Sequence, residues 1–150
     1  MSFKDLGVNP ALIKALHTAG IEKPFPIQKA TLPDAIAGKD ILGRGQTGSG
    51  KTLAFGLALM TRLAGKTAAP MKPLALVLSP TRELAMQISD VIAPLSRTVN
   101  LNSQVVAGGL SYSKQIQALK RGVPIVVATP GRLIDLIQKK HLRLDDILIT

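Results

Sequence analysis

Cysteine and tryptophan are absent from this 150-residue sequence, and its aromatic residues are three Phe and one Tyr. Without cysteine the chain cannot form disulfides or thiolate metal sites, so we expect any bound metal to use oxygen ligands. With so few aromatics the core must be aliphatic and rich in Ala, which suits packed layers of helix and sheet. No apolar run reaches the ~18 to 20 residues of a membrane span, and the polar start of the chain lacks a signal-peptide core. These absences predict a globular protein without a membrane partner, whose default compartment is the cytoplasm.

Acidic residues are also scarce, and the imbalance of charge indicates a polyanionic partner. The chain has 19 Lys and Arg against 9 Asp and Glu, a net charge of +10. Nucleic acid is the first candidate for such a partner. Because the basic residues are dispersed along the chain, simple solubility explains the charge equally well. The motifs have to decide between these interpretations.

The most informative motif runs from 45 to 52 and reads Gly-Gln-Thr-Gly-Ser-Gly-Lys-Thr. It fits the pattern GxxxxGK[ST], in which backbone N–H groups and a helix N-terminus surround phosphates, Lys51 reaches the β- and γ-phosphates and Thr52 binds Mg²⁺. The segment 40–44 before it reads as a short strand and 53–60 after it as a mostly buried helix. A Gly/Ser turn with a solvated lysine is the alternative interpretation. The strand, loop and helix context favours a nucleoside triphosphate site.

Strands and helices alternate along the whole chain. The expected helices are 10–19, 26–38 with a possible kink at Pro33, 53–60, 82–96, 111–121 and 131–139. The expected strands are 40–44, 74–79, 104–107 and 124–128. Such alternation predicts right-handed βαβ units and an α/β fold, with a parallel sheet covered by helices on both faces. Loops starting at Gly45, Pro80, Gly108 and Thr129 should then gather at one edge of the sheet.

The last four residues, Ile147 to Thr150, read as the beginning of a fifth buried strand. Because domain boundaries usually lie in exposed linkers, we expect the sequence to be a fragment that is incomplete at its C-terminal strand. An unfinished core strand would also predict low folding cooperativity, which a sharp, high-temperature melt would contradict.

Several motifs in order resemble one family. They are Pro24 to Gln28 after Gly20, the loop 45–52, Pro80 to Ala85, Gly108-Gly109 and Thr129 to Arg132. Together they resemble the N-terminal RecA-like domain of DEAD-box ATP-dependent RNA helicases, a P-loop NTPase fold. The resemblance covers essentially residues 1–150, with 1–38 as the Q-motif region. It implies a partial first RecA-like domain that ends just before the Asp-Glu-Ala-Asp motif.

The resemblance implies ATP as the nucleotide. Gln28 corresponds to the family's Q motif, whose amide can read the adenine edge, and Phe3 has the spacing of an upstream aromatic that would stack on adenine. Taken alone, Gln28 could instead be a solvent-facing helix residue and Phe3 a hydrophobic anchor. The nucleotide contacts fall on Thr47, Gly48, Ser49, Gly50, Lys51 and Thr52. The catalytic role falls on Lys51 and Thr52, and the metal contact on Thr52.

Two positions depart from the family's pattern. Gly45 stands where Ala is usual, which should be harmless. Phe25 stands where the Q motif usually has a hydroxyl residue. The second change puts one hydrogen bond that stabilises the loop in doubt.

The family's RNA-binding loops correspond to three segments here. The residues implied are Pro80, Thr81, Arg82, Gly108, Gly109, Thr129, Pro130, Gly131 and Arg132. Hydroxyls, bare glycine backbone, guanidinium groups and helix N-termini all suit the sugar-phosphate backbone and carry little sequence information. Helix capping by the two threonines and structural ion pairs of the two arginines remain the alternatives.

The resemblance therefore implies the ATP- and RNA-binding part of an RNA-dependent ATPase that locally unwinds short RNA duplexes. A second RecA-like domain is expected in the full protein, together with the acidic motif and arginine fingers that turnover needs. Asp145 and Asp146 do not replace that motif, because they precede the last expected strand. The alternatives are an isolated nucleotide- and RNA-binding module without turnover and, more remotely, a P-loop ATPase acting on DNA.

Overall fold

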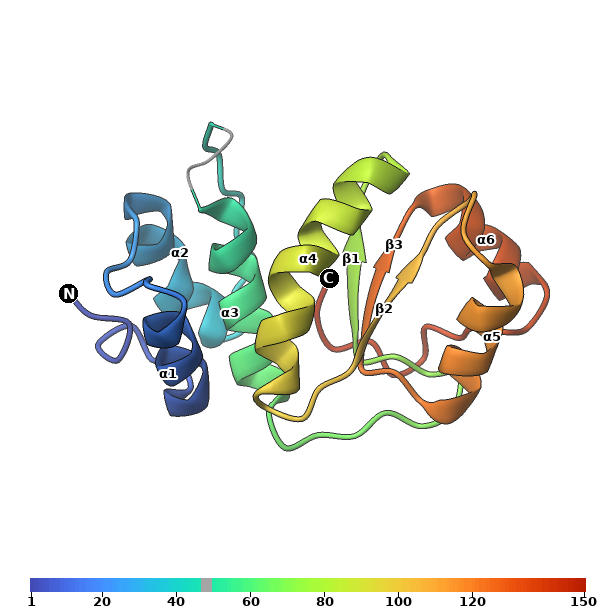
Figure 1. Ribbon diagram of the computed structural model, residues 1–150, viewed down its shortest axis with the longest axis horizontal. Coiled ribbons are helices and arrows are strands. Elements are labelled where there is room, and N and C mark those ends of the chain that lie inside the picture. The colour runs from blue at the N-terminus through green and yellow to red at the C-terminus, as the bar shows by residue number, and fades with distance from the viewer. Residues whose placement is uncertain (47–49) are drawn as a thin grey trace.

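The computed structural model describes residues 1–46 and 50–150 and contains a parallel sheet with helices on both faces (Figure 1). The strands are β1 (Ala75–Leu78), β2 (Ser103–Val106) and β3 (Ile125–Ala128), in the spatial order β1-β3-β2. All four residues of the central strand β3 are buried. The parallel α/β arrangement confirms the expected fold class.

The described residues contain six helices. They are α1 (Pro10–Thr18), α2 (Pro26–Ile36), α3 (Lys51–Leu63), α4 (Arg82–Arg97), α5 (Tyr112–Arg121) and α6 (Pro130–Gln138). Of these, α1 and α2 lie beyond α3 and away from the sheet (Figure 1). Three of the six helices begin where a polar side chain accepts a hydrogen bond from the first turn: Asn9, Thr81 and Ser111. Such caps are local sequence signals, which explains why the expected helix starts agree with the structure to within two residues.

The sheet separates two hydrophobic cores, because successive residues of a strand point to opposite faces. Ile125 and Val127 of β3 pack in the larger core with residues of α1 to α4, whereas Val126 and Ala128 pack with α5 and α6. Figure 1 shows α4 on one side of the sheet and α5 and α6 on the other. None of the helices in the described ranges has the length and apolar character to cross a lipid bilayer.

The expected strand at 40–44 is wrong. These residues form no regular structure, and Ile41 and Leu42 are 41% and 85% exposed. A strand requires a hydrogen-bonded neighbour, and no described strand pairs with this segment. The outer edge of β1 is instead contacted by the end of the chain, where Ile149 forms a single parallel bridge with Ala75. The expected fifth strand is thus present only as that bridge, and Leu148 beside it is 53% exposed.

Candidate nucleotide and nucleic-acid site

Three loops meet at the edge of the sheet where the parallel strands end. They are the segments that follow β1, β2 and β3, namely 79–82, 107–110 and 129–132. The backbone links them, because Ser79 N–H donates to the Ala128 carbonyl at 2.9 Å and Thr129 N–H donates to the Val106 carbonyl at 3.0 Å. The structure therefore brings together the residues expected to hold RNA.

Arg82 joins the first of these loops to the second. Gly109 has φ +80°, and a Cβ atom at this position would collide with the Arg82 guanidinium. Arg82 also pairs with Glu83 at 3.3 Å, which is the structural ion pair considered from the sequence. Both partners of this pair are exposed, so it contributes little to stability and leaves the guanidinium accessible.

Arg132 joins the third loop to the second through a residue that the sequence analysis did not single out. Its Nη1 donates to Gln115 Oε1 at 3.0 Å and to the Leu110 carbonyl at 3.4 Å. Gln115 is 1% exposed and its Nε2 donates to the Ala107 carbonyl at 3.1 Å. Gln115 thus holds both the Gly108-Gly109 loop and Arg132. The only sequence signal was a glutamine on the inward face of an amphipathic helix.

The two threonines at this edge behave differently. The Thr81 hydroxyl accepts from Leu84 N–H at 3.2 Å and caps α4, as the capping alternative expects. Thr129 precedes α6 in the same way, yet its side chain makes no capping hydrogen bond. Its hydroxyl is therefore available for a ligand at the N-terminus of α6, a place where anions are favoured.

The motif at 45–52 ends at the N-terminus of α3. Lys51 is the exposed first residue of that helix, Thr52 is half-buried, and Gly50 precedes them with φ +86°. The predicted phosphate contacts of Thr47, Gly48 and Ser49 lie outside the described residues. The described part of the motif presents an ammonium group and a hydroxyl at a helix N-terminus, where phosphate binding is favoured.

Gln28 is buried at 1% exposure, so the interpretation of it as a solvent-facing residue is wrong. Its Oε1 accepts from Phe25 N–H at 2.9 Å, and its Nε2 donates to the Gly50 carbonyl at 3.1 Å. This pair of bonds ties the start of α2 to the start of α3. An amide has two donors and two acceptor sites, so one of each is left without a partner, and contact with an adenine edge stays a prediction that requires this buried amide to be uncovered.

The two phenylalanines near this site differ in exposure. Phe25 is 50% exposed, and a Cβ atom at Gly50 would come within 2.9 Å of its ring. Phe3 is 2% exposed within the larger core, which matches its interpretation as a hydrophobic anchor. Stacking of Phe3 on adenine stays a prediction that requires this ring to be uncovered.

An ion pair between Asp135 and Lys139 lies near the C-terminal end of α6, the helix that follows the third loop. Lys139 Nζ lies 3.2 Å from Asp135 Oδ1, and the hydrogen bond from Lys139 lowers the pKa of the Asp135 carboxyl. The same bond raises the pKa of Lys139. In residues 1–46 and 50–150, no three His, Asp or Glu side chains cluster as metal ligands.

Comparison with known proteins identifies relatives of this chain. The family model described as DEAD/DEAH box helicase matches residues 25–149. Two curated relatives, both named DEAD-box ATP-dependent RNA helicase CshA and from two strains of Streptococcus pneumoniae, are 44% identical over 147 residues. Those matches cover 98% of this chain and 28% of each relative, so the chain spans less than a third of their length.

A solved structure agrees with these matches. The crystal structure of the RNA-helicase Prp28 from Chaetomium thermophilum bound to ADP superposes with a TM-score of 0.87 at 35% identity. The superposition covers 96% of this chain and 36% of that one. The chain therefore belongs to the DEAD-box RNA helicase family and has the RecA-like α/β fold.

Proposed function

We propose that this chain is the ATP- and RNA-binding part of an RNA-dependent ATPase that locally unwinds short RNA duplexes. One observation carries the proposal: the N-terminal ends of α3, α4 and α6 lie at the same end of the molecule, beyond the carboxyl ends of the strands (Figure 1). Ligands of open α/β sheets bind at that edge. Three helix N-termini at one edge suit two polyanions, a triphosphate and a nucleic-acid backbone.

In this proposal Lys51 contacts the β- and γ-phosphates of ATP and Thr52 supplies one oxygen ligand to Mg²⁺. A single protein hydroxyl is enough, because Mg²⁺ at nucleotide sites keeps several waters and takes other ligands from the phosphates. Gln28 reads the adenine edge with its remaining donor and acceptor, which favours ATP over GTP. When bound, Mg²⁺ neutralises charge that develops on the phosphates during transfer.

The RNA strand lies across the three loops and is held by its backbone. Arg82 and Arg132 provide the cationic groups, Thr129 provides a free hydroxyl, and Gly108 leaves the backbone uncovered, with no atom within 4 Å of an added Cβ. These groups recognise phosphate and sugar, so the proposal predicts little sequence preference. Turnover and strand separation belong to the longer protein, where a second RecA-like domain closes on the first.

Nucleotide binding is tested by titrating fluorescently labelled ADP into the chain with Mg²⁺ and competing with unlabelled ATP or GTP. The variant Lys51→Ala should weaken binding at least ten-fold, because a charge-assisted contact to phosphate is lost. Lys66→Ala, which removes an exposed lysine after α3, is the matched control and should bind normally. Competition by GTP as strong as that by ATP would contradict the role proposed for Gln28. Equal nucleotide affinities of the Lys51→Ala and Lys66→Ala variants would contradict the role proposed for Lys51.

RNA binding is tested with a labelled single strand at several salt concentrations. Arg82→Ala should weaken binding at every sequence tested and reduce the slope of log K against log salt by about 1. Arg97→Ala, at the other end of α4, should not. Absence of ATP hydrolysis by the longer protein, with ATP and RNA still bound, would favour the alternative of a binding module. Stimulation of the longer protein's ATPase by DNA alone would overturn the choice of RNA.

A further inference from the structure

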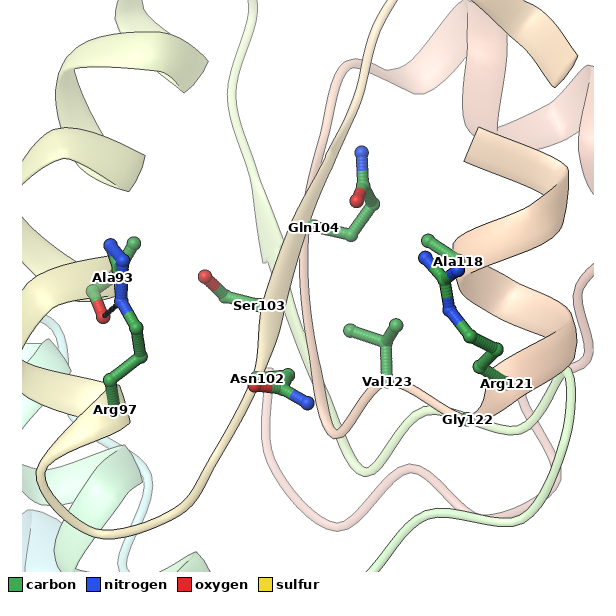
Figure 2. A pocket seen from close by; sticks show the side chains of 9 residues that line it. All are labelled: Ala93, Arg97, Asn102, Ser103, Gln104, Ala118, Arg121, Gly122 and Val123. Atoms are coloured by element: carbon green, nitrogen blue, oxygen red, sulfur yellow. Dashed lines mark hydrogen bonds between the residues drawn. The ribbon is translucent and has the colours of Figure 1, made fainter. Parts of the chain in front are cut away.

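A hollow of about 390 Å³ lies at the start of β2, remote from the candidate RNA loops at the other end of the same strand. Its lining includes Arg97, Ser103, Gln104 and Arg121. Figure 2 shows β2 running between the two arginines, with Arg97 at the end of α4 and Arg121 at the end of α5. The hollow therefore surrounds a strand edge.

That edge has free backbone groups. β2 is the outer strand of the described sheet and pairs with β3 alone. The Asn102 carbonyl accepts from Ile125 N–H of β3, and the Val106 carbonyl accepts from Thr129 N–H just after β3. The alternation of a parallel ladder therefore turns the backbone of Ser103 and Val105 outward. The Val105 carbonyl accepts from Gln104 Nε2 at 3.0 Å, which leaves an N–H at both positions and the Ser103 carbonyl for a partner.

The charges around the edge are of one sign. Arg97 and Arg121 are both exposed, and neither pairs with a carboxylate in the described part of the chain. No acidic side chain of the described residues lines the hollow. A helix C-terminus by itself favours a basic residue, so the arginines alone would not indicate a ligand. The unpaired strand edge between them does.

We propose that β2 binds an extended acidic peptide of a partner protein as an added strand. Side chains of an added strand point alternately to the two faces of the sheet, as those of Ser103 and Gln104 do in Figure 2. Two consecutive acidic residues would therefore reach Arg97 on one face and Arg121 on the other. A peptide fits this edge better than a nucleic acid because the edge needs both donors and acceptors, whereas a phosphate backbone offers acceptors. The site would stay open while the opposite end of the strands holds RNA.

The probe is a fluorescein-labelled eight-residue peptide of alternating Val and Thr with a central Asp-Glu pair, and binding is followed by anisotropy. We expect the Asn-Gln version to bind several-fold more weakly. Arg97→Gln and Arg121→Gln should each weaken binding of the acidic peptide about two- to five-fold. Lys120→Gln, an exposed neighbour on α5 outside the hollow, is the matched control and should have no effect.

Strand addition is tested by N-methylation of the peptide at alternate residues. Methyl groups on the edge that faces β2 should abolish binding, and the same number on the other edge should leave it unchanged. Equal binding of the two methylated peptides, or of the acidic and amide peptides, would overturn the proposal. So would a concentration-dependent dimer that the peptide cannot dissociate, since a second copy would then occupy the edge. Loss of RNA affinity in Arg97→Gln would assign this face to nucleic acid instead.

Discussion

Replacing Gln115 with Leu tests whether one buried amide holds two of the candidate RNA loops. The change removes the 3.1 Å bond to the Ala107 carbonyl and the 3.0 Å bond from Arg132. A buried carbonyl left without a donor costs about 1–3 kcal/mol, and the bond to the half-exposed arginine contributes about 0.5–1.5 kcal/mol. Better burial of Leu offsets roughly 1 kcal/mol of this loss. We expect a net decrease of about 0.5–3.5 kcal/mol in the free energy of unfolding.

Urea unfolding followed by circular dichroism measures this decrease. With a slope of about 2 kcal/mol per molar urea, the midpoint should fall by about 0.3–1.8 M. Gln117→Leu is the matched control, because Gln117 is exposed on the same helix and should change stability by no more than about 0.5 kcal/mol. Identical midpoints for the two variants would refute the reasoning. A double-mutant cycle with Arg132→Met should then give a coupling of about 0.5–1.5 kcal/mol.

Three further predictions concern backbone strain, capping and pH. Gly50→Ala and Gly65→Ala both place a side chain at positive φ, +86° and +83°, which costs about 1–2 kcal/mol of stability each. Only the side chain at position 50 also meets an atom at 2.5 Å, so urea unfolding should show Gly50→Ala to be less stable than Gly65→Ala by about 1–3 kcal/mol. Phe25→Thr gives α2 a capping hydroxyl and should add about 0.5–1 kcal/mol to the free energy of unfolding. The unfolding temperature should therefore rise, and a lower one would contradict this. The hydrogen bond from Lys139 lowers the pKa of Asp135, so the stability that this carboxylate contributes is present above the ordinary Asp pKa of about 3.9 and is lost as pH falls through the lowered value. When the free energy of unfolding is measured from pH 6 downward, Asp135→Asn should therefore lose less stability on acidification than the unchanged chain.

The helices and three of the strands could be predicted because their signals are local. Asn9, Thr81 and Ser111 cap helices whose starts are readable from a few residues. The strand expected at 40–44 failed for a different reason. Ile41 and Leu42 indicate burial, but a strand also needs a neighbour, and pairing is decided by residues far along the chain.

The candidate site divides in the same way. The glycines, threonines and arginines of the loops were recognisable from their types and order. The contacts that hold those loops were not, because Gln115 and Gln28 act on carbonyl and N–H groups brought near by the fold. Helical periodicity places Gln115, unlike Gln117, on the inward face of α5, but it does not identify the groups that Gln115 contacts. Only the tertiary structure shows that these are the Ala107 carbonyl and Arg132.

The strand order β1-β3-β2 has a consequence for anything that lies across the carboxyl edge of the sheet. A linear ligand meets the loops in the order 79–82, 129–132, 107–110, which differs from their order along the chain. Neighbouring strands lie about 4.8 Å apart, so the outer two loops are separated by about 9.6 Å. That distance corresponds to about three nucleotides of a stacked nucleic-acid strand with a rise of about 3.4 Å per nucleotide. For a nucleic acid bound as proposed, the sheet would set the number of nucleotides that the three loops span, and lengthening a loop would change its contacts without changing that number.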